Sequence, residues 1–353
     1  MIRRPPRSTL SSSSAASDVY KRQPYTRKMI AYLRYKRIPF EVIWGQPEEV
    51  LEEMNIQPPK PVLLPVFILE KEGEEQAVTD STPLIRYFEN LYPERSVLPK
   101  NPVMNFINYV LEDFGDEWCT KYMFHYRWHF EEDADNAGTI LPLGINSTLN
   151  DKDLSFFKEY FAKRQIERLW VVGSSDNTAE FIDRSYKTIL SIFEKHFKEQ
   201  PFLLGCNPSS CDFAVYGQFT QLIGFDPTPR RIAYELSPRT VAWVSTLEDR
   251  GGLEFSAEEN TLDNLSESIH DLFKELSISY IPTMIENHRA ISNGEKEWKV
   301  DLDGYQWKQK SFPYQAKCLD WIRAEYQNLA SDHKEDILNF LKDNNCESLV
   351  EKV

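Results

Sequence analysis

Two short stretches of the sequence carry residues suited to holding a small polar ligand. Pro65 opens an apolar run, and a proline at the start of a buried strand is often cis, which turns the backbone of the preceding Leu64 outward into a cleft. Asp80 or Ser81 then caps a helix that has Pro83 in its first turn. The unpaired N–H groups of such a helix end suit a carboxylate.

A small α/β unit is needed to position these residues. Residues 66–69 read as a strand buried on both faces, Gly73 marks a polar turn, and residues 76–78 read as a returning strand. Before them, Pro24 fits the first position of a helix whose apolar residues recur at helical spacing. The earlier elements expected in chain order are a helix over residues 24–38, a strand over 40–44 and a short helix over 48–54.

This arrangement resembles the glutathione-binding half of the glutathione S-transferase superfamily. In that family a cis-proline, here Pro65, opens the third strand, and the residue before it, here Leu64, offers its backbone to the cysteinyl part of glutathione. The acidic residue and serine at the next helix start, here Asp80 and Ser81, hold the γ-glutamyl end, where Asp80 can meet the ammonium group. The resemblance implies a thioredoxin-like fold over residues 24–100 and glutathione as co-substrate.

The position that activates the thiol in this family lies just before the proline that starts the first helix. The family has Ser, Cys or Tyr there, whereas this chain has Gln23. Residues 1–23 hold five basic residues against one acidic residue and a run of serines, and they resemble translated adapter or vector sequence. We therefore expect an N-terminally truncated domain, with a non-native or disordered segment over residues 1–23, no first strand and no identifiable catalytic residue.

Residues 101–330 are expected to form an all-α domain. Residues 103–130 read as one long aromatic-rich helix or a helix pair, and the matching family helix borders the second-substrate pocket. Trp118 and Tyr122 are therefore weak candidates for that pocket, since aromatic residues at helical spacing mostly pack in a core. His125 and His129 lie one turn apart without a converging third ligand, so no metal site is predicted.

A second resemblance covers residues 201–217, where the family carries a turn and a helix of its second domain. Gly205 precedes the turn, and Ser209 with Asp212 forms the pattern of a capping box. The Ser209 side chain bonds the N–H three residues on while Asp212 bonds back, which satisfies two unpaired donors. This role is structural.

The remaining segments read as helices and one hairpin. Phe157 and Phe161 are expected on the buried face of a helix over residues 151–170. Asp303 and Gly304 divide an alternating stretch near residues 297–310, which predicts a hairpin extension of the helical domain. The other expectations are helices over residues 178–198, 238–248, 262–286 and 312–326 and a charged tail over 331–353.

Composition limits the classes of partner. The formal net charge of −14 argues against nucleic acid or an anionic membrane surface as the main partner. No apolar run approaches the roughly 20 residues that a membrane helix needs. The five scattered cysteines contain no Cys-x-x-Cys pair, which suits a reducing compartment, and we expect a cytoplasmic protein.

The leading hypothesis is a glutathione-dependent transferase with an electrophile, thiol or disulfide as second substrate in the inter-domain cleft. The alternative is a non-catalytic protein of the same fold that uses the cleft to bind a partner. Because many members of the family are dimers, the resemblance also implies a homodimer. A native Ser, Cys or Tyr before Pro24 would favour the enzyme.

Overall fold

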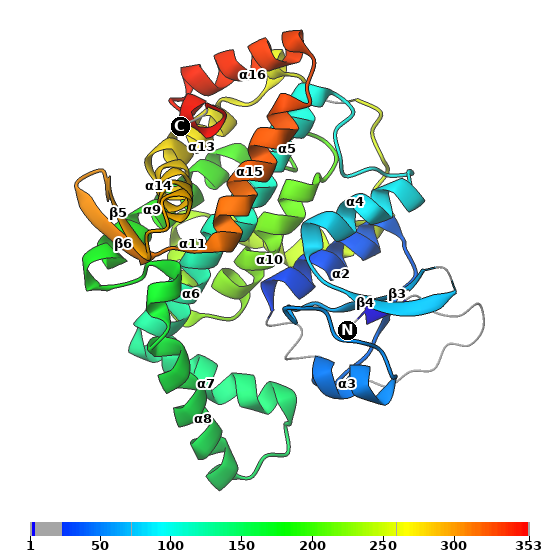
Figure 1. Cartoon of the computed structure of the whole chain (residues 1–353), viewed down its shortest axis with the longest axis vertical. Helices are drawn as coiled ribbons and strands as arrows, with labels where there is room; N and C mark the ends of the chain where they lie inside the picture. The colour runs from blue at the N-terminus through cyan, green and yellow to red at the C-terminus, as the bar shows by residue number, and fades with distance from the viewer. Residues whose placement is uncertain (1, 4–22, 72, 259, 352–353) are drawn as a thin grey trace.

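The structure, a computed structural model, describes residues 2–3, 23–71, 73–258 and 260–351 and places a small α/β domain beside a larger helical body (Figure 1). The predicted fold class, a thioredoxin-like domain followed by an all-α domain, is confirmed. The α/β domain consists of β1 (Ile2–Arg3), α2 (Pro24–Lys36), β2 (Glu41–Val42), α3 (Pro47–Glu53), β3 (Phe67–Lys71), β4 (Glu74–Val78) and α4 (Ser81–Leu91).

The helical body follows without interruption. Its helices are α5 (Pro102–Asp113), α6 (Cys119–His129), α7 (Glu131–Ile145), α8 (Asp151–Ile166), α9 (Asp176–His196), α10 (Ser210–Gly224), α11 (Pro227–Leu236), α12 (Pro238–Thr246), α13 (Glu267–Ile278), α14 (Tyr280–Ser292), α15 (Pro313–Gln327) and α16 (Ser331–Asp343). The hairpin β5 (Glu297–Leu302) and β6 (Tyr305–Lys310) lies between α14 and α15, as predicted. No helix among the described residues combines the length and the apolar character that crossing a bilayer requires.

The sheet of the α/β domain has the strand order β2-β1-β3-β4. Strand β1 runs parallel to β3, with Ile2 opposite Phe67, and antiparallel to β2. The expectation that no strand precedes Pro24 is therefore wrong for Ile2–Arg3, because a vacant place between β2 and β3 would leave backbone groups on both strands without partners. The rest of the segment expected to be disordered, residues 4–22, lies outside the described residues.

Helix α2 connects the sheet to the helical body. Met29, Ala31 and Tyr32 are fully buried. At the N-terminus of the helix, α10 approaches so closely that a Cβ atom on Gly217 would lie 2.5 Å from the carbonyl oxygen of Pro24. Only glycine allows this approach without displacing backbone, so α10 fixes the position of the end of α2 that faces the cleft described below.

Helices α5 and α6 form one rod, which agrees with the predicted helix or helix pair over residues 103–130. A single π-helical turn, Phe114–Trp118, joins them. Gly115 lies in this turn against α10, where an added Cβ would lie 2.8 Å from the Val215 nitrogen. Such turns insert an extra residue into a helix and often occur at functional sites, and this one carries Asp116 and Glu117, which are considered below.

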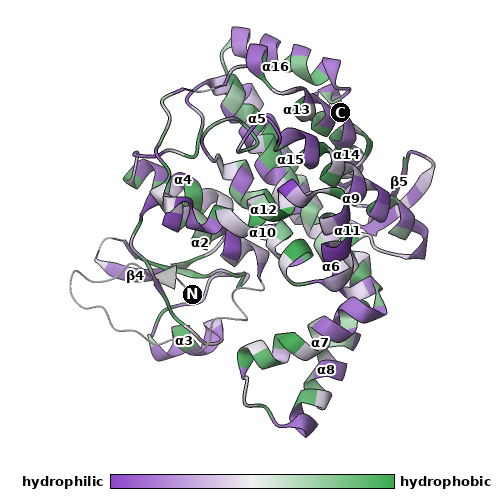
Figure 2. Cartoon of the chain, turned by 180° about the vertical axis from the view of Figure 1, so that it is seen from behind, coloured by the Kyte–Doolittle hydropathy of each residue, from purple (hydrophilic) through white to green (hydrophobic). Residues whose placement is uncertain are grey.

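Helices α7 and α8 form an arm that projects from the body (Figure 1). Seen from behind, both helices of the arm carry apolar residues (Figure 2). No residue of α8 is buried, and Phe157 is 37 % exposed. The expectation that Phe157 and Phe161 lie on a buried face is therefore wrong, because α8 packs mainly on α7 and only to a small extent on α6 of the body.

The C-terminal segments pack into the body instead of forming a loose tail. Trp298 and Trp307 of the hairpin are buried, and so are Ile337 and Phe340 of α16 and Leu349 beyond it. The charged residues of α16 face outward, whereas these apolar side chains cover α5 and its neighbours. The charged composition of residues 331–353 therefore describes one face of a packed helix, which corrects the expected tail.

Candidate functional site

A cavity of about 1000 Å³ lies where α2 and α4 of the α/β domain meet α5, α6 and α15 of the helical body. It is the candidate functional site because it brings the two sequence-predicted stretches together. Its lining includes Gln23, Tyr25, Pro61, Leu64, Asp80, Ser81, Thr82, Arg86, Glu112, Asp113, Asp116, Glu117, Lys121, Phe312, Tyr314, Gln315, Cys318 and Trp321.

The α/β domain contributes the predicted helix start. Asp80 is the N-cap of α4, and its carboxylate accepts a hydrogen bond from the Thr82 N–H at 3.3 Å. Its backbone angles, φ 79° and ψ 114°, are rare for a residue other than glycine and cost of order 1–3 kcal/mol. The neighbouring Ser81 is only 6 % exposed and lines the cavity. The turn into α4 thus holds both side chains at the cavity wall.

The predicted strand start lies on the same wall. Leu64 lines the cavity, whereas Pro65 is buried behind it and does not. The peptide bonds before Pro61 and Pro65 are both cis. Of the four residues that the sequence assigns to a ligand, the structure therefore brings Leu64, Asp80 and Ser81 together around one space.

Helix α15 forms the opposite wall, which the sequence analysis missed. The Tyr314 hydroxyl donates a hydrogen bond to Asp80 Oδ2 at 2.9 Å, and Gln315 and Trp321 line the cavity beside it. Burial raises the pKa of the Cys318 thiol well above its usual range, so this cavity residue is no reactive thiolate. The only sequence signal for this wall is that polar and aromatic residues lie on the face of the helix opposite the apolar Leu319.

A buried ion network joins the two domains beneath the cavity. Lys28 of α2 contacts Glu112 at 2.9 Å and Asp116 at 2.6 Å, and Arg86 of α4 contacts Glu112 at 2.6 Å. Burial opposes the charges, but Arg86 and Lys28 hold the pKa of Glu112 well below its usual range. Removing one partner of such a pair leaves an uncompensated buried charge, at a cost of about 3–5 kcal/mol.

The π-helical turn and Asp113 just before it bring three carboxyl groups to the cavity wall. Burial raises the pKa of Asp116 to about 6 and that of Glu117 to about 7, and it also raises the pKa of Asp113. Perturbed carboxyl groups in a cleft are typical of functional sites, although ion networks also produce them. One helical turn further, burial lowers the pKa of Lys121 to about 8.

The hydroxyl groups at the N-terminus of α2 belong to Tyr25, which lines the cavity, and to Thr26, which is fully buried outside the cavity lining. Gln23 lines the cavity at the position where the resembling family has Ser, Cys or Tyr. The Tyr25 hydroxyl donates to the carbonyl oxygen of Asp116 at 2.8 Å, and burial raises its pKa well above its usual range. Tyr25 is therefore already engaged in a structural contact between α2 and the π-helical turn.

Trp118 and Tyr122 do not line the cavity, which corrects their assignment to a substrate pocket. Both are fully buried, and the Trp118 indole N–H donates to the Tyr122 hydroxyl at 2.6 Å. Trp118 also packs on Trp307 with ring centroids 5.4 Å apart. Helical spacing alone could not distinguish the cavity side of α6 from the side that faces α9 and the hairpin.

The predicted capping box is confirmed. Ser209 is the N-cap of α10, its side chain accepts from the backbone N–H of Asp212, and the Ser209 N–H donates back to Asp212 Oδ2 at 2.8 Å. Asp212 Oδ1 also accepts from the Leu203 N–H at 2.8 Å, which ties the preceding turn to the helix. These contacts lie away from the cavity and have the structural role expected of them.

His125 and His129 stack with ring centroids 4.6 Å apart. His125 Nδ1 pairs with Ser174 Oγ at 2.7 Å, and burial lowers the pKa of His125 to about 3. Across the described residues, no group of three or more histidine, cysteine or acidic side chains is arranged to hold a metal ion.

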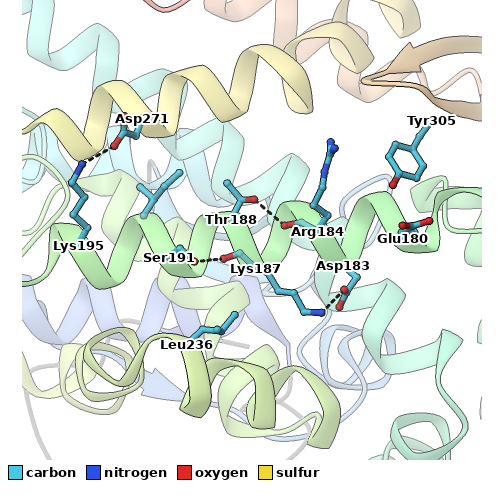
Figure 3. A pocket seen from close by; sticks show the side chains of 11 residues that line it. Glu180, Asp183, Arg184, Lys187, Thr188, Ser191, Lys195, Leu236, Asp271 and Tyr305 are labelled. Atoms are coloured by element: carbon cyan, nitrogen blue, oxygen red, sulfur yellow. Dashed lines mark hydrogen bonds and ion pairs between the residues drawn. The ribbon is translucent and has the colours of Figure 1, made fainter.

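A second hollow of about 770 Å³ runs along α9 (Figure 3). Its cations already have carboxylate partners, with Lys187 on Asp183 at 2.6 Å and Lys195 on Asp271 at 3.0 Å. Arg184 likewise contacts Asp303 at 2.6 Å. Surface pairs of this kind contribute little binding energy to a further ligand, so the inter-domain cavity remains the candidate site.

Comparison with known proteins agrees with the architecture of the α/β domain. Residues 20–96 match the family model described as the glutathione S-transferase N-terminal domain. The chain therefore contains a domain of the glutathione S-transferase superfamily, and this domain includes Leu64, Asp80 and Ser81.

A solved structure is also similar to the chain. It is a glutathione S-transferase from Rhodospirillum rubrum F11 with 18 % sequence identity and a TM-score of 0.40, and the match covers 70 % of this chain and 96 % of that one. No curated protein matches the chain in sequence.

Proposed function

We propose that the protein binds glutathione in the inter-domain cavity and acts as a glutathione-dependent transferase on an electrophilic or disulfide substrate. One observation carries the proposal. The Leu64 backbone segment and the α4 N-terminus of a glutathione S-transferase domain line the same cavity of about 1000 Å³. This volume is at the upper end of ordinary small-molecule sites, which suits a tripeptide together with a second molecule.

The chemistry of the wall suits the parts of glutathione. An extended peptide can pair with an exposed backbone segment in the manner of an added strand, which is the role we assign to Leu64. The α-carboxylate of the γ-glutamyl residue would lie at the N-terminus of α4, beside Ser81. Its ammonium group would meet Asp80, whose carboxylate Tyr314 already holds in place.

The second substrate would occupy the half of the cavity bounded by α15. Phe312 and Trp321 line the cavity, and so do the apolar Val171 and Val172. Apolar walls of this kind favour an apolar electrophile, because burying its surface stabilises the complex by roughly 25 cal/mol per Å².

The proposal includes a homodimer, which rests on the family resemblance alone. Light scattering on the purified chain tests it.

A non-catalytic binding protein is the second candidate, and Gln23 favours it. A thiolate needs a donor aimed at its sulfur or a nearby positive charge. Gln23 is a weak donor, and Tyr25 is engaged with Asp116. This chain would then bind glutathione without using its thiol.

Calorimetry with glutathione, followed by a turnover assay with a chlorodinitroarene, separates these possibilities. Asp80→Ala with Ser81→Ala should weaken binding by about 2–5 kcal/mol, because both partners of a charged group are lost. The matched control is Ser331→Ala with Asp332→Ala. These two residues also lie at the start of a helix, α16, but they are exposed to solvent.

The outcomes are distinct. Unchanged affinity in the Asp80 and Ser81 double variant would place glutathione elsewhere, and no binding by the parent chain would remove the proposal. Binding without turnover would favour the non-catalytic protein.

A further inference from the structure

Lys121 is a buried cation in the cavity wall that the proposed glutathione site does not use. It is 3 % exposed and lines the cavity from α6. Its Nζ donates to Gln309 Oε1 at 3.3 Å, and within the described structure it forms no ion pair. The rings of Trp118 and Trp307 lie 5.8 Å from the same nitrogen. An ammonium group in such surroundings is poorly solvated, which favours the neutral amine.

The contrast with Lys28 shows that burial alone does not produce this state. Lys28 is fully buried, but Glu112 and Asp116 contact its Nζ at 2.9 Å and 2.6 Å. Burial lowers its pKa, and these two carboxylates more than compensate, so the pKa of Lys28 is raised. Of these two lysines, only Lys121 therefore carries a substantial fraction of neutral amine near neutral pH.

Glu117 lies four positions before Lys121 and lines the same cavity. Burial raises the pKa of this carboxyl group to about 7, while burial lowers the pKa of Lys121 to about 8. The two groups interact electrostatically, and the Gln315 side chain donates a hydrogen bond to Glu117. Both residues line the cavity, so a neutral amine and a protonated carboxyl group can occur in its wall near pH 7, an arrangement that suits acid–base chemistry.

We propose that Lys121 is a carbonyl-binding nucleophile whose amine forms an imine with an aldehyde or ketone in the cavity, with Glu117 as the proton donor. Lysine amines desolvated in pockets are known nucleophiles for carbonyl compounds. This inference does not depend on glutathione binding. It assigns a second reactive centre to the cavity and a chemical class to its ligand.

The atoms balance without a further reactant. The Lys121 nitrogen attacks the carbonyl carbon, the carbonyl electron pair moves to oxygen, and a proton passes from nitrogen to that oxygen to give a carbinolamine. Glu117 then protonates the hydroxyl group, the C–O bond breaks and water leaves, and the nitrogen lone pair forms the C=N bond. One amine, one carbonyl compound and one carboxylic acid become one iminium ion, one water molecule and one carboxylate. The iminium ion and the carboxylate remain as an ion pair.

The pH dependence has a predicted direction. The reaction needs Lys121 neutral and Glu117 protonated, so its rate should rise with pH below about 7, pass a maximum between about 7 and 8, and fall above about 8. The charged, titratable and polar groups that face this pair are Asp80 at the start of α4, Tyr25 from α2, Asp113 and Asp116 from the same rod, Tyr280 from α14, Tyr314, Gln315 and Cys318 from α15, and Gln309 from β6.

Reductive trapping on the full chain tests the proposal. Benzaldehyde with sodium cyanoborohydride, followed by peptide mapping in a mass spectrometer, locates any imine as a stable benzyl adduct. At pH 7 a lysine with a pKa near 8 has roughly 200-fold more neutral amine than an ordinary lysine. Adduct formation at Lys121 should therefore be about 10²-fold faster than at exposed lysines, and Lys121→Met should abolish it.

Lys36→Met is the matched control, because Lys36 is buried outside the cavity and pairs with Glu89 at 2.9 Å. That variant should leave trapping at Lys121 unchanged. Glu117→Gln should slow the reaction and remove the fall in rate above pH 8. If Lys121→Met does not fold, Lys121→Arg replaces it as the test variant, because arginine retains the positive charge and forms no imine.

Three results would overturn the proposal. The first is adducts spread over exposed lysines, and the second is trapping that persists at the parent rate without Lys121. The third is a rate in the parent chain that rises steadily toward pH 10, which would show a lysine of ordinary pKa.

Discussion

At the scale of single residues, Asp80 connects the two halves of the molecule. Its backbone takes the rare angles φ 79° and ψ 114°, and its carboxylate is held by the Thr82 N–H on one side and by the Tyr314 hydroxyl on the other. Strained residues persist where the surrounding structure determines them, and they cluster at ligand sites. A residue from the helical extension thus orients the acidic group that we assign to the ammonium of glutathione.

Tyr314→Phe tests that orientation. The substitution removes the hydroxyl group and leaves the ring, so glutathione affinity should fall by about 0.5–1.5 kcal/mol, roughly 2- to 10-fold. Calorimetry measures the change directly. Tyr160→Phe on the exposed arm removes a hydroxyl group far from the cavity and should leave affinity unchanged. An unaltered dissociation constant in Tyr314→Phe would mean that α4 alone positions Asp80.

Gln23 is the residue that decides between the two candidate functions. Gln23→Ser and Gln23→Cys place a donor or a thiol at the start of α2, beside the cavity. If glutathione binds as proposed, turnover of a chlorodinitroarene should rise by about 10²-fold or more, the usual scale for one donor at a reacting centre. Glutathione affinity should change little. A parent chain as fast as both variants would show that another group activates the thiol.

At the scale of elements, the crossing of α2 and α10 positions the start of α2. Gly217→Ala should destabilise the protein by about 1–3 kcal/mol, since the new methyl group meets the Pro24 carbonyl oxygen 2.5 Å away and backbone must move. Because α2 borders the cavity, glutathione affinity should fall as well. Chemical denaturation and calorimetry measure the two effects.

Gly224→Ala provides the control within the same helix. An added Cβ there meets nothing within 4 Å, so the substitution should be neutral or slightly stabilising. If Gly217→Ala behaved like Gly224→Ala, the close approach of α10 to α2 would not constrain the site.

The elements also show what a sequence can and cannot predict. The capping box of Ser209 and Asp212 is local, and the cap at Asp80 is too, so both follow from spacing alone. The wall formed by Tyr314 does not, because its partner Asp80 lies 234 positions away and no periodic pattern encodes that contact. Phe157 illustrates the opposite error. The apolar face of a helix indicates that another element could pack against it, but it does not show that such an element is present.

At the scale of the whole molecule, the buried carboxyl groups govern stability as a function of pH. Burial raises the pKa of Asp116 to about 6 and those of Glu117 and Asp212 to about 7. The folded state then retains protons that the unfolded chain releases from about pH 4. Unfolding therefore releases protons between about pH 4 and 7, and the contribution of these groups to stability is lost as pH rises through that window.

These three carboxyl groups favour a melting temperature that is higher near pH 5 than near pH 8, whereas His125 and His196, whose pKa values burial lowers, act in the opposite sense below about pH 6.5. Glu112, whose pKa is lowered, acts in the opposite sense and should reduce stability only as pH falls below about 4.3. Glu117→Gln should make the decline between pH 5 and 8 shallower, because one of the responsible groups no longer titrates. The same pH dependence of the melting temperature in Glu117→Gln and in the parent chain would contradict the assignment of a protonated Glu117 to the cavity.

The hydrogen bond between Tyr314 and Asp80 also has a consequence for biosynthesis. Ribosomes add about 5–20 residues per second and domains fold as they emerge, so roughly 10–50 s separate the synthesis of Asp80 from that of Tyr314, 234 positions later. During this interval the nascent chain presents α4 without its opposite wall. A chain that ended before α15 would therefore leave Asp80 without its Tyr314 partner, and synthesis of α15 completes this wall of the cavity.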